Sequence, residues 1–319
     1  MTSLKPIPTF DFVELTDPAK NQQLLKAMAV ACEQWGFFKI VNHGLADRFS
    51  QAILPRMIDF FDLPAEAKKS LEKQQHQPWG FYDQELTKNR RDWKEIFDFN
   101  LHEADDHAIW PPQTPDFKPV MSNWYQSCET ISQRLLRCFS EVLVSDSDYL
   151  TPHFEGHNSS FLRLNFYPQL PNSTTLDNQK DDLDEASSPL GISEHTDAGA
   201  LTILAQDDIA SLQVLREGEW TTVEPEKDAL IINIGDMIQV WSNDRFKAPP
   251  HRVLTNDSSA RCSAAFFYNP VYHTVCKPLV KNGAQYRPVH WGEFRAARAS
   301  GDYADLGKEN QISDYRVRN

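Results

Sequence analysis

Cysteine is scarce in this sequence, and the few present form no recognisable pattern. They are scattered, odd in number and never spaced as Cys-x-x-Cys: Cys32, Cys128, Cys138, Cys262 and Cys276. This excludes a disulfide scaffold or a zinc module as the basis of the fold. We expect mostly buried free thiols in a reducing cytoplasm.

Positive charge and long apolar runs are also in short supply. Against 45 acidic residues there are 32 basic ones, a net charge of −13, which disfavours binding to nucleic acid or anionic membrane. No apolar run is long enough to span a bilayer, and residues 1–12 lack the pattern of a secretory signal. The 319 residues are enough to bury a large core in one or two domains. We therefore expect a cytoplasmic protein with a small-molecule partner, and composition leaves its oligomeric state open.

The first half of the chain is mainly helical in pattern. Residues 8–12 predict a short strand, and Asp17 followed by Pro18 predicts the start of a helix. The next helical pattern contains Pro55, where we expect a kink or a boundary. Residues 119–144 carry apolar side chains on one face and predict a long amphipathic helix.

After residue 158 the pattern changes to short β-like runs separated by turns. These runs are "SSFLRLNFYPQL", "ALTILAQ", "LQVLREGEWTTVEP", "ALIINIGDMIQVWSN", "HRVLTN" and "RCSAAFFYNP". Closely spaced strands of this kind favour a sandwich, a jelly roll or a barrel. Residues 171–189 are polar and acidic, which predicts a solvated loop or, alternatively, a lid beside the site.

His195 and Asp197 stand two residues apart in front of an apolar β-like run. Side chains two apart in a strand point to the same face. A lone pair of this kind is common in turns, but His251 follows 54 residues after Asp197 at the start of another run. Two histidines and one carboxylate leave coordination positions open, as in non-haem Fe(II) oxygenases. A structural zinc site is usually closed by four protein ligands.

Arg261 lies ten residues after His251, and Ser263 follows two residues later. In one strand, Ala265 and Phe267 would share the face of this pair. Burying an arginine among apolar side chains is costly unless an anion meets it. A guanidinium beside a hydroxyl suits a carboxylate, although an arginine exposed at a strand start is the alternative.

Together these motifs resemble the Fe(II)/2-oxoglutarate-dependent dioxygenases, in particular the isopenicillin N synthase-like branch. The resemblance extends over residues 7–110 and 158–316 and includes "IPTFDF", "WGFFKIVNHG", "FFDLPAEAKKSL", "LTKNRRDWKEIFDF", "LRLNFYP", "HTDAGALTILAQD" and "APPHRVL". It implies a mainly β fold with helices (α+β), in which a double-stranded β-helix, a distorted jelly roll, packs against N-terminal helices. The expected parts are an N-terminal region over 7–117, a linking helix over 118–157, a catalytic core over 158–290 and a C-terminal helix and tail over 291–319.

The resemblance also assigns residues to the site. It implies that three residues bind Fe(II) and form the catalytic centre: His195, Asp197 and His251. It places four residues at the 2-oxoglutarate site: Arg261, Ser263, Asn165 and Tyr167. Three aromatic residues are candidates for the substrate pocket: Phe267, Phe81 and Tyr82. The implied reaction uses O2 to hydroxylate, desaturate or cyclise a small-molecule metabolite, as in secondary metabolism, and releases succinate and CO2.

Two alternatives to this interpretation remain open. Isopenicillin N synthase and aminocyclopropane carboxylate oxidase resemble this chain and carry similar Arg-x-Ser anchors without using 2-oxoglutarate, so Arg261 does not settle the co-substrate. The second alternative is a non-catalytic β-helix module that binds a small acid. Loss of a metal ligand would favour it, but all three ligands are present here. The primary substrate cannot be read, because its pocket would be built by residues 80–100, 171–189 and the tail beyond 290, where pattern carries least information.

Overall fold

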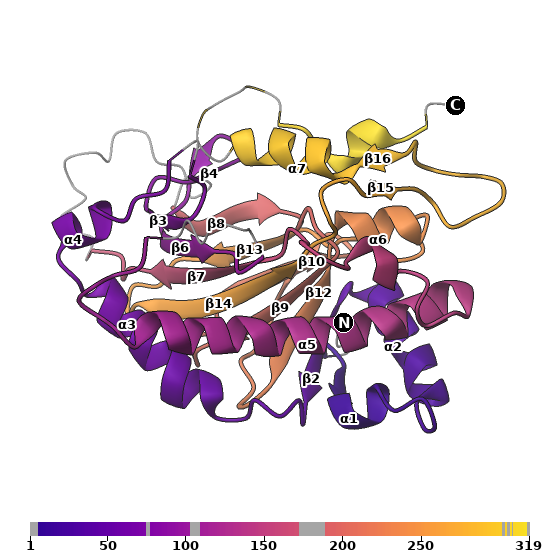
Figure 1. The fold of residues 1–319 in the computed structure, drawn as a ribbon, viewed down its shortest axis with the longest axis horizontal. Coiled ribbons are helices and arrows are strands. Elements are labelled where there is room, and N and C mark those ends of the chain that lie inside the picture. The colour runs from indigo at the N-terminus through magenta and orange to yellow at the C-terminus, as the bar shows by residue number, and fades with distance from the viewer. Residues whose placement is uncertain are drawn as a thin grey trace.

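The computed structural model describes residues 6–74, 77–102, 109–171, 189–301 and 309–317, together with residues 304 and 307. Within this part of the chain, two β-sheets form a distorted jelly roll, and helices pack around it (Figure 1). The predicted fold class, mainly β with helices, is therefore confirmed. The predicted loop at 171–189 falls almost entirely outside the described residues.

The two sheets enclose a shared interior. The larger sheet runs, in spatial order, through β1 (Thr9–Asp11), β2 (Phe37–Val41), β12 (Leu230–Ile234), β9 (Leu201–Gln206), β14 (Arg261–Tyr268), β7 (Phe161–Tyr167), β6 (Glu95–Phe99) and β3 (Gly80–Tyr82). The smaller sheet runs through β11 (Glu219–Thr222), β10 (Leu212–Arg216), β13 (His251–Leu254) and β8 (Leu190–His195). A hydrophobic cluster joins Tyr167 and Ile231 of the larger sheet to Val253 of the smaller one. Side chains from both sheets therefore fill this part of the interior of the jelly roll.

The N-terminal region adds strands to both edges of the larger sheet. On one side β2 pairs antiparallel with β12, and on the other β6 pairs antiparallel with β7. Four of the five residues of β2 are buried, as its sequence FFKIV predicts. Since β6 and β3 lie beside β7, this early part of the chain can contribute walls to a cavity in the jelly roll.

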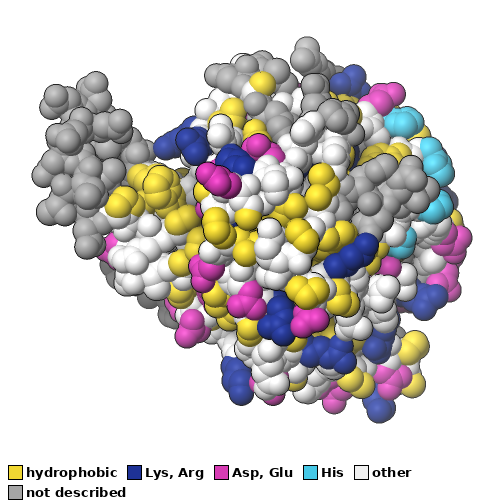
Figure 2. Space-filling model, turned by 60° about the vertical axis from the view of Figure 1, so that its left-hand side comes forward, with side chains coloured by type: hydrophobic (Ala, Val, Ile, Leu, Met, Phe, Trp, Pro, Cys, Tyr) yellow, Lys and Arg dark blue, Asp and Glu magenta, His cyan; other side chains and the backbone are white. Residues whose placement is uncertain are grey.

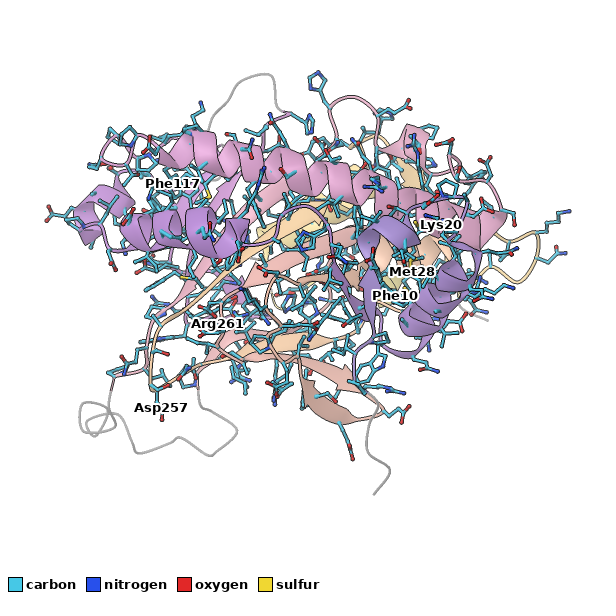
Figure 3. The ribbon with its side chains drawn as sticks, turned by 90° about the horizontal axis from the view of Figure 1, so that it is seen from below. Phe10, Lys20, Met28, Phe117, Asp257 and Arg261 are labelled. Atoms are coloured by element: carbon cyan, nitrogen blue, oxygen red, sulfur yellow. The ribbon has the colours of Figure 1, made fainter. Side chains whose placement is uncertain are left out.

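Helices cover the outer face of the larger sheet. The long helix α5 (Phe117–Val144) runs across β14 and β9, and α3 (Leu54–Phe61) packs on β14 and β7 (Figure 1, Figure 3). Buried side chains recur along α5 at helical spacing, as expected: Met121, Trp124, Cys128, Ile131 and Leu135. The remaining N-terminal helices are α1 (Phe12–Leu15), α2 (Gln22–Gln34) and α4 (Ala65–Lys69).

Three local expectations can be compared with the structure. The boundary predicted at Pro55 is confirmed, because a π-helical turn over Phe49–Ile53 gives way to α3 there. The helix start predicted at Asp17 is wrong. Its carboxylate instead accepts the Ala19 amide in a turn, and α2 begins at Gln22. The apolar run after Leu230 is not all strand either, since α6 (Asp236–Trp241) follows β12 after Gly235.

The C-terminal elements frame the open end of the jelly roll. The expected helix is α7 (Trp291–Ser300), which follows β15 (Val275–Cys276) and β16 (Val289–His290) and lies above β8 in Figure 1. Beside it is a hairpin of β4 (Leu86–Thr87) and β5 (Arg90–Arg91). The side-chain amide of Asn89, at the tip of this hairpin, donates to the carbonyl of Gly307 at 2.6 Å. The N-terminal region and the tail thus meet at this end.

Other properties follow the sequence closely. All five cysteines are free and buried, and burial raises the pKa of each thiol. Among the described residues, no helix combines the length and apolar character needed to cross a membrane. On the face seen in Figure 2, acidic and basic side chains are interspersed.

Candidate active site

His195, Asp197 and His251 converge at one end of the jelly roll. β8 ends at His195, β13 begins at His251, and these two residues are partners in the antiparallel pairing. The Nε2 atom of each imidazole lies 3.7 Å from Asp197 Oδ1. Among the described residues, this is the one group of three metal-ligating side chains whose ligand atoms lie within 4.8 Å of one another. Two imidazole nitrogens and one carboxylate oxygen suit Fe(II) and leave positions open for other ligands.

The backbone around Asp197 is not the strand that alternation predicted. β8 ends at His195, so Asp197 lies in the turn that follows. The first amides of α6 hold this turn: Asp236 N donates to Asp197 O at 2.8 Å, and Met237 N donates to Gly199 O at 2.9 Å. Such amides have no partner within their own helix, so they are free to bind a neighbouring loop. The close approach needs Gly235, where a Cβ atom would lie 2.3 Å from Gly199 O.

Backbone carbonyls fix the tautomer of both histidines. His195 Nδ1 lies 2.8 Å from Ser193 O, and His251 Nδ1 lies 3.1 Å from Pro249 O. A carbonyl accepts only, so each Nδ1 carries the proton and each Nε2 presents its lone pair towards Asp197. Burial also holds the pKa of His195 well below its ordinary value, which keeps the imidazole neutral. Both rings are therefore prepared as metal ligands.

Two neutral donors orient the carboxylate. Thr202 Oγ1 and Asn233 Nδ2 donate to Asp197 Oδ2 at 2.5 and 2.6 Å. Burial opposes ionisation of Asp197, but the pKa of the carboxyl is nevertheless lowered, and these two hydrogen bonds contribute to that shift. With Oδ2 occupied, Oδ1 faces the histidines, so the arrangement fits a metal bound by one carboxylate oxygen.

Arg261, Ser263, Asn165 and Tyr167 lie together on two adjacent strands. In the register of β14 and β7, Arg261 is opposite Tyr167 and Ser263 is opposite Asn165. The guanidinium of Arg261 is 1% exposed, lies over the Tyr167 ring and donates to Gln206 Oε1 at 2.7 Å. Its Nε and Nη1 atoms have no hydrogen-bond partner among the described residues. A buried cation with free donors is costly, and the carboxylate of 2-oxoglutarate fits this requirement.

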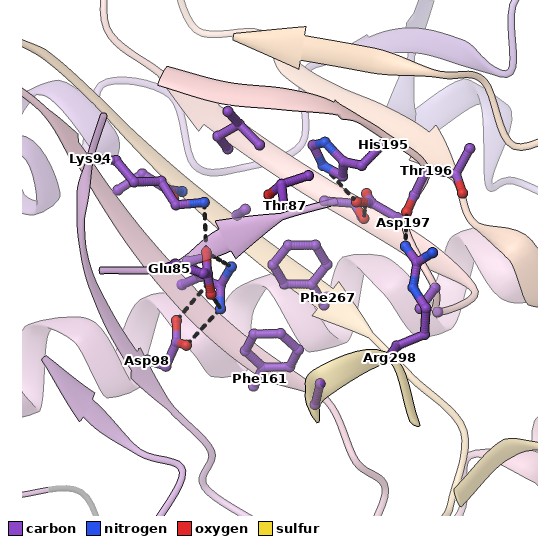
Figure 4. Close-up of a pocket in the computed structure, with 18 of the residues that line it drawn as sticks. Glu85, Thr87, Lys94, Asp98, Phe161, His195, Thr196, Asp197, Phe267 and Arg298 are labelled. Carbon is purple, nitrogen blue, oxygen red and sulfur yellow. Dashed lines mark hydrogen bonds and ion pairs between the residues drawn. The ribbon is translucent and has the colours of Figure 1, made fainter. Parts of the chain in front are cut away.

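A cavity of about 690 Å³ is lined both by the three candidate metal ligands and by the four residues of the expected 2-oxoglutarate site (Figure 4). Phe267 lines it and stacks on Phe161 with 4.7 Å between ring centroids. Phe81 and Tyr82, also predicted for the pocket, are not among the residues that line this cavity. Phe81 is buried on the side of the sheet that faces Phe60 of α3, and the Tyr82 ring lies against the Lys73 ammonium group.

The N-terminal strands bring a buried ion cluster to the cavity wall. Arg163 of β7 bonds to Asp98 and Glu85 at 2.8 Å, and Lys94 bonds to Glu85 at 2.6 Å. Burial opposes ionisation of Glu85, but Arg163, Lys94 and Lys73 outweigh it and hold its pKa far below the ordinary value. The cluster therefore ties β6 and the segment before it to the jelly roll.

Sequence reasoning missed Phe161 and Arg163, although a signal was present. In FLRLNFY of β7, Leu162 and Leu164 are buried against the helix side, so the alternate residues face the cavity. Alternation around Asn165 and Tyr167 would have identified both residues. Thr202 and Asn233 gave no comparable signal, because their role depends on a turn that the sequence pattern does not predict.

Comparisons with known proteins agree with this geometry. Residues 158–270 match the model of the 2OG-Fe(II) oxygenase superfamily, and residues 7–119 match the N-terminal model described as non-haem dioxygenase in morphine synthesis. Jasmonate-induced oxygenase 2 of Arabidopsis thaliana is 31% identical over 96% of this chain and 83% of its own length. Gibberellin 2-beta-dioxygenase 8 of the same plant is 31% identical over 91% of this chain and 81% of its own length.

Solved structures give the same result. The crystal structure of JOX2 in complex with 2OG, Fe and JA has a TM-score of 0.78 and 30% identity, covering 93% of this chain and 86% of that one. A full-length Neurospora crassa protein in complex with alpha-KG and thymine has a TM-score of 0.81 at 22% identity, covering 93% and 97%, and supports the fold. The cofactor and co-substrates of this chain are Fe(II), 2-oxoglutarate and O2. It belongs to the 2OG-Fe(II) oxygenase superfamily and is an Fe(II)/2-oxoglutarate-dependent dioxygenase of small-molecule metabolites.

Proposed function

We propose that His195, Asp197 and His251 hold the Fe(II) at which this enzyme oxidises its substrate. The observation that carries the proposal is the convergence of two Nε2 lone pairs on one carboxylate oxygen, at 3.7 Å each. When bound, the iron supplies the redox chemistry that couples decarboxylation of 2-oxoglutarate to oxidation of a C–H bond. The protein prepares this site through the carbonyls of Ser193 and Pro249, which leave both ligand nitrogens unprotonated.

Arg261 and Ser263 bind the distal carboxylate of 2-oxoglutarate in this proposal. The free Nε and Nη1 donors of Arg261 support the assignment, as does Ser263, which is 1% exposed and lines the same cavity. Asn165 and Tyr167 lie across from these two residues on β7 and complete the co-substrate pocket. The rest of the cavity is left to the primary substrate, which lies against Phe267.

Hydroxylation of a small metabolite is the outcome we propose for the substrate. JOX2 has been solved in complex with 2OG, Fe and JA, and the Neurospora crassa protein in complex with alpha-KG and thymine, so proteins of this fold bind small molecules together with the co-substrate. The cavity of about 690 Å³ is of the size that holds such molecules. Five free, buried thiols support the cytoplasm as the compartment of the reaction.

A spectroscopic titration tests the iron site directly. Anaerobic addition of Fe(II) and 2-oxoglutarate to the wild-type protein produces a weak visible charge-transfer band. Asp197→Ala removes the band and weakens Fe(II) binding, whereas Asp208→Ala, which removes an exposed carboxylate, changes neither. A band of wild-type intensity in Asp197→Ala and in His251→Ala would show that the metal binds elsewhere.

A further inference from the structure

The cavity is lined by several cationic side chains, and three of them are neutralised by buried carboxylates. Arg163 and Lys73 both bond to Asp98, at 2.8 and 3.0 Å. Lys94 bonds to Glu85 at 2.6 Å and to the carboxylate of Asp92 at 3.0 Å. Three cations thus face three carboxylates, and this cluster offers no net charge to an anionic ligand.

Two further arginines of the cavity are committed to other partners. Arg261 lies at the 2-oxoglutarate site. Arg298 of α7 donates to Thr196 O at 2.9 Å, to Gln311 Oε1 at 2.5 Å and to Asn310 O at 3.4 Å. In Figure 4 its guanidinium points at the Thr196 backbone. Arg298 therefore ties the C-terminal tail to the turn that carries Asp197.

Arg295, one turn before Arg298 on α7, keeps donors that no described residue accepts. Its Nη1 atom donates to Ser159 O at 2.6 Å and lies 3.3 Å from the Tyr272 hydroxyl. Its guanidinium lies 5.2 Å from the centroid of the Phe161 ring and 5.9 Å from that of Trp79. No Asp or Glu of the described chain forms an ion pair with it. Nε and Nη2 thus have no protein acceptor among the described residues, while the aromatic rings hold the group in place.

An apolar floor lies beside this arginine. The rings of Phe161 and Phe267 are stacked at 4.7 Å with 19° between their planes. Figure 4 shows them side by side in the middle of the pocket, with Asp197 and His195 beyond Phe267. Small side chains of α7, Ala296 and Ala299, also line the cavity. The floor therefore begins at the ring under Arg295 and extends towards the metal ligands.

We propose that the primary substrate is a small organic acid whose carboxylate binds Arg295 and whose apolar body lies on Phe161 and Phe267. This inference rests on the proposed iron site, because it places the far end of the molecule next to that site. One guanidinium with free donors matches the two oxygens of a carboxylate. A phosphate ester would bring a second negative charge, and the described residues that line the cavity offer no second free cation to meet it. Arg295 then determines which end of the substrate is presented for oxidation.

Binding of matched acids and amides tests the proposal. The full-length protein is loaded anaerobically with Fe(II) and saturating 2-oxoglutarate, then titrated with phenylacetate, 3-phenylpropionate, 4-phenylbutyrate and 1-naphthylacetate, each beside its primary amide. Binding is followed through tryptophan fluorescence, since Trp79 and Trp291 line the cavity. We expect at least one acid to bind roughly tenfold or more tightly than its amide, as a charge-assisted contact provides.

Three variants test whether the preference for the acid over the amide depends on Arg295. Arg295→Gln lowers the affinity for the acid roughly tenfold to hundredfold and leaves that of the amide unchanged. Arg295→Lys restores part of the preference, because it keeps the charge without the paired donors. Arg90→Gln is the control, since it removes an exposed arginine that does not line the cavity.

The possible outcomes separate the two proposals. If no acid binds, if acids and amides bind alike, or if Arg295→Gln keeps the preference of the wild type, the acid site is wrong. An equal loss in Arg90→Gln also contradicts it, because the effect would then be one of net charge. A missing charge-transfer band in the wild type would instead contradict the iron site, which the fluorescence titration does not measure.

Discussion

Asn233 Nδ2 lies 2.6 Å from Asp197 Oδ2, the carboxylate oxygen that points away from both histidines. Asn233 belongs to β12 of the larger sheet, whereas Asp197 lies in the turn after β8 of the smaller one. The hydrogen bond therefore joins the two sheets at the metal site. With Thr202 on the same oxygen, it fixes which carboxylate oxygen is presented to iron.

Removing these donors should weaken metal binding while the three ligands stay in place. Thr202→Val and Asn233→Ala are each expected to lower Fe(II) affinity roughly tenfold to hundredfold, as loss of a partner that orients a ligand commonly does. Anaerobic metal titration measures the change, and Asn123→Ala, on the exposed side of α5, serves as control. Thr202→Val keeps the shape of the side chain, so wild-type affinity in a folded Thr202→Val would contradict the role of this hydrogen bond.

The orphan donors of Arg261 predict a selective defect. Arg261→Leu removes the proposed partner of the distal carboxylate, and loss of a charged pair from such a site costs about 2–5 kcal/mol, roughly 30-fold to several thousandfold in 2-oxoglutarate affinity. Succinate formation measured against 2-oxoglutarate concentration reports the shift, and Fe(II) affinity should stay near that of the wild type. Equal loss of both affinities would indicate a general collapse of the site.

Local pattern predicted closely spaced strands and the face of β14 that enters the cavity, whereas the jelly roll itself was implied by the family resemblance. Alternation along RCSAAFFY puts Arg261, Ser263 and Phe267 on one side, and all three line the cavity. Alternation also predicted that Asp197 lies beside His195, which is correct, but it did so by placing both residues in one strand, which is wrong. The carboxylate of Asp197 instead lies near His195 because a turn held by α6 places it there. The sequence of α6 is β-like, so its helix was not predicted.

The surroundings of Phe81 and Arg295 could not be predicted from the sequence, because they depend on contacts between elements that are far apart in the chain. Phe81 fits an aromatic pocket residue by composition, yet the pairing of β3 with β6 turns it towards Phe60 and the helices. Arg295 lies on a helix that was expected, but its position over Phe161 depends on how α7 docks on the jelly roll. Local periodicity predicts which face of an element is apolar, and it does not predict which distant element meets that face.

The contact between Gly235 and the turn after β8 predicts a defect in metal binding from a single methyl group. Gly235→Ala would place Cβ 2.3 Å from Gly199 O, so the turn that carries Asp197 has to move. We expect a loss of about 1–3 kcal/mol in the free energy of unfolding and weaker Fe(II) binding. Gly301→Ala is the matched control, because its Cβ would meet the flexible Glu309 side chain at 3.1 Å. Unchanged Fe(II) affinity in Gly235→Ala would show that the turn tolerates the displacement.

The buried cluster around Glu85 predicts how stability depends on pH. The folded protein holds the pKa of Glu85 far below its ordinary value, so the ionised carboxylate stabilises the fold above the unfolded-state pKa of about 4.3. This stabilisation is lost as pH falls below that value, by about 1.4 kcal/mol for each pH unit. Glu85→Gln cannot ionise, and it leaves Arg163 and Lys94 with one buried partner fewer.

At pH 7.5 we expect Glu85→Gln to be less stable than the wild type by about 3–5 kcal/mol, the usual cost of breaking a buried ion pair from one side. The difference narrows as pH falls from about 4.3 to 3.3, because only the wild type loses the contribution of Glu85. Urea denaturation of both proteins across this pH range measures the difference, with Glu219→Gln, at the exposed first residue of β11, as control. A difference that stays constant down to pH 3.3 would show that packing of the side chain, and not its charge, stabilises this wall of the cavity.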